Sequence, residues 1–242
     1  MIPARHSKWA QALFHPYIMR LMRRQFHGFH LLGAVPEWPQ EHLLVVLPNH
    51  ASWWDGFFIH LLNERLWQRV PYLMMLEEQL AKNRFFSRLG VFSVRSQGFA
   101  AARRSLQYLQ TIIRDNKPGD IFLCLFPQGE LRPYNLRPLG YKPGILWLLR
   151  QASGPAAIVQ LGIRIEYLEQ QHADVFFEFA PLEFSDARMT DLQTLQAAHA
   201  RLLERLQGRI IAGERGVNLL QGRTSINEKF QRWRHFRTGE TT

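Results

Sequence analysis

The chain has 242 residues, of which 46% are hydrophobic and 21% charged. This length is sufficient for one large domain with a substantial core, and the composition excludes a wholly disordered chain. The formal net charge of +10 favours an anionic partner, which can be a nucleic acid, an acidic membrane surface or an anionic substrate. The single cysteine, Cys124, excludes a disulfide framework within the chain and is interpreted as a small buried hydrophobe.

Residues 1–35 are expected to form an N-terminal segment that contains an amphipathic helix. Apolar and basic side chains alternate there at helical spacing, with apolar Phe14, Ile18, Leu21 and Met22 and basic Arg20, Arg23 and Arg24. Pro16 is expected to kink or split this helix. Two interpretations remain open: the helix packs on the domain, or it lies in the interface of an anionic bilayer.

Residues 36–212 are expected to form the main domain. Short aliphatic or aromatic runs predict strands at 43–48, 71–76, 91–95, 120–126, 156–163 and 173–180. Helical periodicity predicts helices at 53–69, 98–115, 142–152 and 190–212. Buried strands that alternate with helices indicate an α/β sheet covered on both faces. Residues 213–242 are expected to be a basic tail with a short helical patch around Phe230 and Trp233.

The sequence also bears on cellular location. The first residues, M-I-P-A-R-H-S-K-W-A, contain no apolar stretch followed by a small-residue cleavage site. No stretch approaches the ~18 uninterrupted apolar residues of a spanning helix. We therefore expect a cytoplasmic protein that is peripheral on the inner face of the membrane.

The segment P-N-H-A-S-W-W-D-G-F-F places a histidine and a carboxylate directly after the first predicted strand. On a continuous helix, His50 and Asp55 would be about 140° apart around the axis and ~7.5 Å apart along it, so they would not share a face. They can meet only if His50 lies in a turn and Asp55 lies in the first helical turn. Ser52 as the N-cap, with Asp55 at the capping-box position, fits that geometry.

Two interpretations of this pair follow. In the first, Asp55 caps a helix and His50 is an ordinary turn residue. In the second, Asp55 holds one ring nitrogen of His50, and the other nitrogen takes a proton from a substrate hydroxyl. The helix start would then offer free backbone N–H groups to an anion or oxyanion. The four neighbouring aromatic side chains suit an acyl chain, a membrane interface or a core.

Two more predicted strands end in polar residues. Arg95 follows the strand in G-V-F-S-V-R, where it is either a solvated charge or a phosphate ligand. The loop F-P-Q-G-E-L-R-P, residues 126–133, follows the most hydrophobic strand and exposes Glu130 and Arg132. It is either a plain polar loop or part of a site. Because ligands of open α/β sheets bind beyond the carboxyl ends of strands, these ends and the His50 turn together indicate one site.

Five blocks of the sequence, taken in order, resemble the glycerophospholipid (lysophosphatidate-type, 1-acylglycerol-3-phosphate) acyltransferase family. N-H-A-S-W-W-D resembles its first motif, N-H-x-x-x-x-D, and G-V-F-S-V-R resembles its second block. F-P-Q-G-E-L-R-P is similar to the third block, F-P-E-G-T-R-S, and Y-K-P-G is similar to the F-K-x-G that follows. P-A-A-I-V-Q-L-G-I is similar to the fourth, V-P-V-[VI]-P-V. The blocks span residues 40–165, roughly half of the chain.

The resemblance implies a glycerol-phosphate acyltransferase-like α/β fold with a mixed, largely parallel sheet covered by helices. It implies that His50 is the general base, that Asp55 orients it, and that an acceptor hydroxyl attacks a thioester carbonyl. The donor would be acyl-CoA or acyl carrier protein, with no metal or prosthetic group. Asn49 and Pro127 would be structural members of the motifs. The other motif residues would bind the acceptor: Arg95, Gln128, Gly129, Glu130, Arg132 and Lys142.

The third and fourth blocks depart from the family pattern. The departures are Gln128 for Glu, Glu130 for Thr, Leu131 for Arg, Arg132 one place late, and Gln160 near the second proline of the fourth block. A carboxylate at Glu130 would repel a phosphate unless Arg132 or Arg95 offsets it. The acceptor hydroxyl can therefore belong either to a phospholipid precursor or to a non-phosphorylated lipid such as a glycolipid.

The leading hypothesis is a membrane-associated O-acyltransferase of phospholipid or related lipid biosynthesis, working at an anionic membrane surface. One alternative is a non-catalytic basic module for anionic lipid or nucleic acid. The absence of a nucleic-acid motif argues against it, and no nucleic-acid partner is expected. Another is a hydrolase with water as the acyl acceptor. Against it, the sequence has no G-x-S-x-G elbow, and Cys124 lies within a predicted strand.

Overall fold

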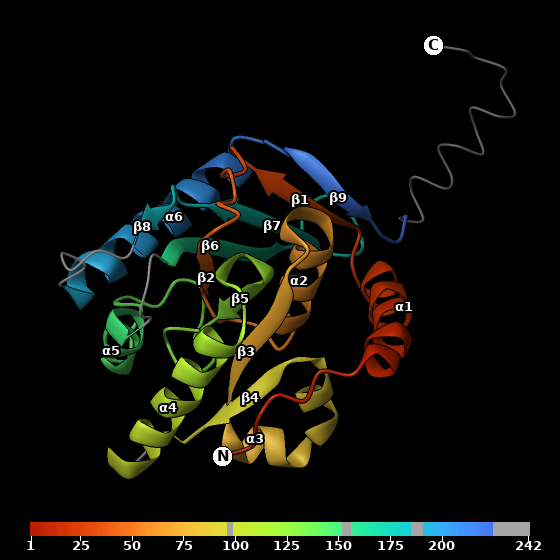
Figure 1. Cartoon of the computed structure of the whole chain (residues 1–242). Coiled ribbons are helices and arrows are strands. Elements are labelled where there is room, and N and C mark those ends of the chain that lie inside the picture. The colour runs from red at the N-terminus through yellow and green to blue at the C-terminus, as the bar shows by residue number, and fades with distance from the viewer. Residues whose placement is uncertain (96–98, 152–155, 185–190, 225–242) are drawn as a thin grey trace, which may run out of the picture.

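The computed structural model describes residues 1–95, 99–151, 156–184 and 191–224. Within them, strands form one sheet with helices on both faces (Figure 1). The strands are β1 (Gly28–Leu32), β2 (Leu43–Pro48), β3 (Val70–Leu76), β4 (Val91–Val94), β5 (Ile121–Cys124), β6 (Ala156–Glu166), β7 (Asp174–Phe179), β8 (Glu183–Phe184) and β9 (Val217–Gln221). The α-helices are α1 (Lys8–Gln25), α2 (Asp55–Leu62), α3 (Glu77–Lys82), α4 (Phe99–Asp115), α5 (Gly144–Gln151) and α6 (Leu192–Ile211). Short helical segments of other types are η1 (Asn63–Trp67), η2 (Arg84–Leu89) and η3 (Pro118–Asp120).

The strand order of the sheet is β4-β3-β5-β2-β6-β7-β1-β9, and β8 pairs with β6. The neighbours β4, β3, β5, β2 and β6 run parallel to one another. β7 is antiparallel to β6 and parallel to β1, while β9 is antiparallel to β1. The predicted mixed, largely parallel sheet is therefore confirmed. Since β2 to β6 are parallel, their carboxyl ends share one edge of the sheet.

The side chains of β2 alternate between two hydrophobic cores, one on each face of the sheet. Leu44 and Val46 belong to a cluster with apolar residues of α1 and α2, on one face of the sheet. Leu43, Val45 and Leu47 belong to a cluster with residues of α4, α5 and α6, on the other face. Successive side chains of a strand point to opposite faces, so a strand buried on both faces is apolar throughout. This is why L-L-V-V-L-P reads as a continuous apolar run.

Helix α1 packs on the domain with one side only. Ile18 and Met22 are buried in the core that α1 shares with α2, whereas Trp9, Leu13 and Tyr17 are exposed. The helix is one element from Lys8 to Gln25, so Pro16 does not split it. Burial of the apolar side offsets the hydrogen bond that a proline removes from a helix.

The sheet extends on both sides of the expected domain, residues 36–212. β1 lies between β7 and β9, and β9 belongs to the expected C-terminal tail. Both strands are held by pairing partners far away in the sequence, which local periodicity does not report. The expected helical patch around Phe230 and Trp233 lies outside the described residues. Among the described helices, none has the length and apolar character that crossing a bilayer requires.

Candidate active site

His50 and Asp55 meet at the carboxyl end of β2. Strand β2 ends at Pro48, and α2 begins at Asp55, so residues 49–54 form the connecting turn. The His50 Nδ1 atom lies 2.9 Å from Asp55 Oδ2. A carboxylate oxygen accepts, so Nδ1 carries the hydrogen of this bond. The turn thus gives the contact that a continuous helix would prevent.

Asp55 is fully buried and also holds the turn together. Its Oδ2 accepts hydrogen bonds from the backbone N–H groups of Ala51 and Ser52, at 2.8 and 2.9 Å. The bond from Ser52 N is the one that the expected capping box makes with the side chain three residues on. Ser52 Oγ accepts from Trp54 N at 3.1 Å, one residue before the Asp55 N–H that a full capping box would use. The N–H groups of Ala51, Ser52 and Trp54 are therefore occupied and are not free for an oxyanion. The expectation that other N–H groups of this helix start bind an oxyanion stays a prediction.

The second ring nitrogen of His50 is available. No described residue hydrogen-bonds to His50 Nε2, and the side chain is 24% exposed. The ring of Phe126 stacks on the imidazole, with centroids 4.2 Å apart and planes at 30°. The pair is thus a histidine fixed on one side by a buried carboxylate, packed on one face by an aromatic ring and open at Nε2. This arrangement can exchange a proton with a bound hydroxyl.

The loop after β5 holds the main chain of His50. The buried Gln128 accepts a hydrogen bond from His50 N through its Oε1, and Arg132 N donates to His50 O at 2.8 Å. Gly129 has a φ of +68°, which glycine adopts without strain in this tight turn. Gln128 therefore fixes the backbone of His50 and leaves its ring nitrogens to other partners. Its expected role in acceptor binding stays a prediction.

Asn49 extends the pairing of β2 with β6 beyond the strand end. Its buried side chain donates from Nδ2 to Ile163 O at 3.0 Å and accepts at Oδ1 from Ile163 N at 2.7 Å. Its own N–H donates to Leu161 O at 3.2 Å. Pro127 O accepts from Lys142 N at 2.8 Å, which ties the two loops of the site together. Both residues thus make contacts that hold loops of the site, and their structural role in the family motifs stays a prediction.

Three of the predicted acceptor-binding residues form one charged cluster. Glu130 Oε1 accepts from Arg132 Nη2 at 2.9 Å and from Lys142 Nζ at 3.1 Å. The hydrogen bond from Arg132, and then that from Lys142, hold the pKa of Glu130 below its usual range. The carboxylate thus stays ionised at neutral pH between two cations. One positive charge remains in the cluster.

Arg95 shares the sheet edge but not the cluster. It follows β4, and β3 and β5 lie between β4 and β2, so about three strand spacings, ~14 Å, separate the two strand ends. Arg95 donates through Nε and Nη2 to the carboxylate of Glu77, at 3.0 and 2.9 Å. This contact lowers the pKa of Glu77 to about 2. Among the described residues, no hydrogen bond or ion pair joins Arg95 to His50 or Arg132.

A buried polar network that sequence reasoning missed supports the loop of Lys142. Tyr141 Oη bonds His199 Nδ1, and His199 Nε2 donates to Leu161 O at 3.1 Å. Gln160 Nε2 donates to Leu195 O at 2.7 Å. Burial lowers the pKa of His199 to about 4, so the ring is neutral at pH 7. The apolar pattern of α6 shows which side of the helix is buried. It does not show that the polar His199 lies on that side and finds hydrogen-bond partners there.

One further group of residues has ligand types that suit a metal ion. In the described part of the chain, His15 of α1, His60 of α2 and Glu64 of η1 have ligand atoms within 4.8 Å of one another. His15 Nδ1 and His60 Nε2 are 3.1 Å apart, which is also the distance of a plain hydrogen bond. This group lies outside the His50 site and takes no part in its geometry.

The architecture and the sequence both match known proteins. Among solved structures, the chain is similar to the 1-acyl-sn-glycerophosphate (LPA) acyltransferase PlsC from Thermotoga maritima, with a TM-score of 0.53 and 16% identity. That match covers 84% of this chain and 80% of the other, and it shows a shared fold. No match was found among curated proteins. Residues 32–164, more than half of the 242, match the family model described as acyltransferase. The chain therefore belongs to the acyltransferase family and is an acyltransferase enzyme.

Proposed function

We propose that this enzyme is an O-acyltransferase that moves a fatty acyl group from a thioester, acyl-CoA or acyl carrier protein, to the hydroxyl of a lipid. The reaction would serve phospholipid or related lipid biosynthesis. The observation that carries the proposal is the His50–Asp55 pair, 2.9 Å apart, with Nε2 of the histidine open. The pair lies within the part of the chain that matches the acyltransferase family.

The proposed reaction needs no covalent intermediate on the protein. His50 Nε2 removes the proton of the acceptor hydroxyl while its oxygen attacks the thioester carbonyl. The buried Asp55 carboxylate stabilises the imidazolium that forms and keeps Nε2 directed outward. The tetrahedral intermediate then collapses, the carbon–sulfur bond breaks, and the leaving thiolate takes the proton from Nε2. The products are an ester and a free thiol. No cofactor or metal is required for these steps.

Two classes of acceptor are candidates, and the charges of the cluster of Glu130, Arg132 and Lys142 bear on the choice between them. Its remaining positive charge favours an acceptor with a phosphate, as in a lysophospholipid. Against this, Glu130 hydrogen-bonds both cations, at 2.9 and 3.1 Å, and would have to share them with a phosphate. An exposed carboxylate also accepts hydrogen bonds from hydroxyl groups. A non-phosphorylated acceptor, such as a glycolipid or another neutral lipid, is therefore the second candidate.

We propose that the enzyme acts at an anionic membrane surface on the cytoplasmic side, to which it is attached peripherally. Trp9, Leu13 and Tyr17 of α1 are 57%, 63% and 62% exposed, and they recur every four residues. Trp53, beside the catalytic turn, is 64% exposed. Rows of exposed aromatic and aliphatic side chains on a basic protein suit a bilayer interface.

The decisive experiment combines labelled long-chain acyl-CoA, or the matching acyl carrier protein thioester, with a lysophospholipid or a neutral lipid hydroxyl. Wild-type protein is compared with His50→Ala, and products are identified by mass. We expect His50→Ala to keep the fold and to lower kcat by at least ~100-fold, because the general base is lost. Normal turnover by His50→Ala would remove His50 from that role. Failure of the wild type with both donors would overturn the proposed activity.

A further inference from the structure

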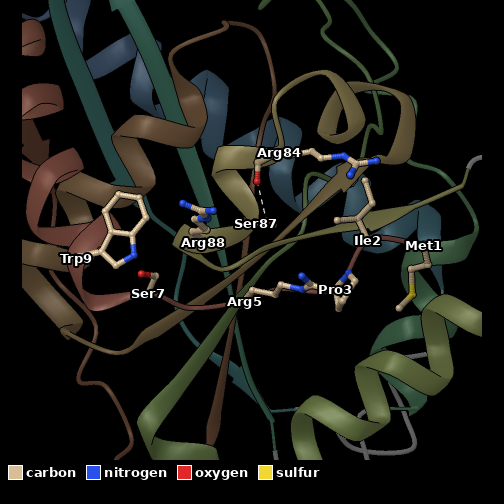
Figure 2. Close-up of a pocket in the computed structure, with 9 residues that line it drawn as sticks. All are labelled: Met1, Ile2, Pro3, Arg5, Ser7, Trp9, Arg84, Ser87 and Arg88. Atoms are coloured by element: carbon tan, nitrogen blue, oxygen red, sulfur yellow. Dashed lines mark hydrogen bonds between the residues drawn. The ribbon is translucent and has the colours of Figure 1, made fainter.

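A pocket of about 600 Å³ lies beside the first residues of the chain (Figure 2), and neither His50 nor Asp55 is among its described lining residues. The segment before α1 runs along the outer edge of β4 and forms one wall. Ile2 and Ser93 exchange two hydrogen bonds, in which Ile2 N donates to Ser93 Oγ and Ser93 N donates to Ile2 O. Arg5 N and Ser7 N donate to the carbonyls of Ser87 and Arg88, at 2.7 and 2.9 Å. The wall is therefore fixed to the sheet edge and to η2.

The pocket is basic, and none of the described residues that line it is acidic. Three arginines line it, Arg5 from the N-terminal segment and Arg84 and Arg88 from η2. None of the three makes an ion pair with a carboxylate in the described part of the chain, whereas Arg95 and Arg132 each do. Arg88 instead places its guanidinium carbon 4.9 Å from the ring centroid of Trp9. Guanidinium groups without a carboxylate partner favour an anion with several oxygens, such as a phosphate.

The pocket also adjoins apolar surface. Met1, Ile2 and Pro3 contribute to its lining next to the arginines, as Figure 2 shows. Trp9, at its rim, is the first of the exposed apolar side chains that continue along α1. A ligand that fits both features carries a phosphate and an apolar tail.

We propose that this pocket binds the phosphate headgroup of an anionic phospholipid within a bilayer. The inference rests on the proposed membrane attachment and adds a specific headgroup site to it. Arg5, Arg84 and Arg88 contact the phosphate oxygens, and the exposed side of α1 lies against the acyl region. The enzyme is thereby held in one orientation on the membrane, which a diffuse positive charge alone would not achieve.

The test is vesicle binding by the full-length protein, measured by co-sedimentation on phosphatidylcholine vesicles with and without phosphatidylglycerol. The double variant Arg84→Gln with Arg88→Gln is compared with Arg103→Gln with Arg104→Gln, which removes the same charge from exposed positions of α4. Circular dichroism and thermal unfolding establish that both variants are folded. We expect the pocket variant to bind phosphatidylglycerol vesicles about 30-fold more weakly and the control less than about threefold more weakly.

The outcomes separate the two proposals. If the wild type does not bind phosphatidylglycerol vesicles, the membrane attachment itself is wrong. If it binds and both variants lose affinity equally, overall charge accounts for binding and the headgroup site is wrong. Inorganic phosphate, titrated by calorimetry, provides a second readout. If the pocket variant loses only phosphate binding and keeps vesicle binding, the pocket takes a free anion, and the lipid assignment is overturned.

Discussion

At the scale of single residues, one oxygen of Asp55 binds both the ring of His50 and the backbone of the turn. Asp55 Oδ2 accepts one hydrogen bond from the ring of His50 and two from the backbone of the turn. The two interpretations of the pair, a structural turn and a catalytic dyad, are therefore compatible within one geometry. A substitution that keeps an acceptor oxygen but removes the charge can separate them.

We expect Asp55→Asn to leave the thermal midpoint nearly unchanged, because the amide oxygen can still accept from the turn. In contrast, kcat should fall by about 10²- to 10⁴-fold, since the charge that stabilises the imidazolium is lost. The measurements are thermal unfolding and acyl-transfer kinetics on the same preparation. Asp55→Ala is the matched variant that should lose both stability and activity. Full turnover by Asp55→Asn would reduce Asp55 to a structural residue.

The carboxylate of Glu130 offsets part of the positive charge of Arg132 and Lys142, where the acceptor is proposed to bind. This carboxylate holds Arg132 and Lys142, so Glu130→Gln should release both cations. If the acceptor carries a phosphate, we expect its KM to fall by about three- to fivefold, a small effect because these groups are exposed and screened. Glu204→Gln, at an exposed position of α6, is the control with the same charge change. A raised KM for a neutral acceptor would instead indicate that Glu130 binds a hydroxyl.

At the scale of elements, α1 belongs to the core and to the surface at once. Its buried side contributes Ile18 and Met22 to the core, so removing the helix would also unfold the domain. Only exposed positions can therefore test its proposed contact with a bilayer. Leu13 and Tyr17 are such positions.

We expect Leu13→Gln with Tyr17→Gln to weaken binding to anionic vesicles at least tenfold, because two apolar side chains no longer enter the interface, each worth about 1.5–3 kcal/mol when fully buried. Ile211→Gln with Phe184→Gln removes exposed apolar side chains from α6 and β8 and should change binding little. Co-sedimentation measures both. Equal binding by the two double variants would show that α1 does not enter the membrane.

At the scale of the whole molecule, two histidines couple stability to pH. Burial, and then the neighbouring His15, lower the pKa of His60 to about 4, and burial lowers the pKa of His199 to about 4. Unfolded histidine titrates near 6.5, so the unfolded chain binds more protons between these two values. The contribution of these two histidines to the free energy of unfolding therefore decreases as the pH falls from about 6.5 to about 4.

Between pH 7 and pH 5 we expect each of these histidines to remove about 2 kcal/mol from the free energy of unfolding. Urea unfolding at both pH values measures the change, and a loss of about 4 kcal/mol is substantial for a domain whose total stability is about 5–15 kcal/mol. His60→Gln should reduce the pH dependence by roughly half. A free energy that stays constant over this range would contradict the lowered pKa values of His60 and His199.

Much of the local structure followed from the sequence. Apolar runs predicted the strands β2, β5 and β7, because a strand buried on both faces is apolar throughout. Helical periodicity predicted α4 and α6, because burial of one side of a helix leaves a period in its residues. The contact of His50 with Asp55 was also predictable, since His50 lies in the turn and Asp55 is the first residue of the helix that follows it. The acyltransferase family was indicated by the order of five blocks and is shown by the family match.

Contacts between distant residues were decided only by the tertiary structure. Gln128 lies 78 positions from His50, and Tyr141 lies 58 positions from His199, yet each pair is hydrogen-bonded. Arg95, expected to bind the acceptor, hydrogen-bonds Glu77, and β3 and β5 separate its strand β4 from β2. Its role in acceptor binding stays a prediction. Periodicity reports which side of an element is buried. The partner of a polar side chain depends on the strand order and on which strand ends share an edge of the sheet. Local sequence patterns predict neither of these.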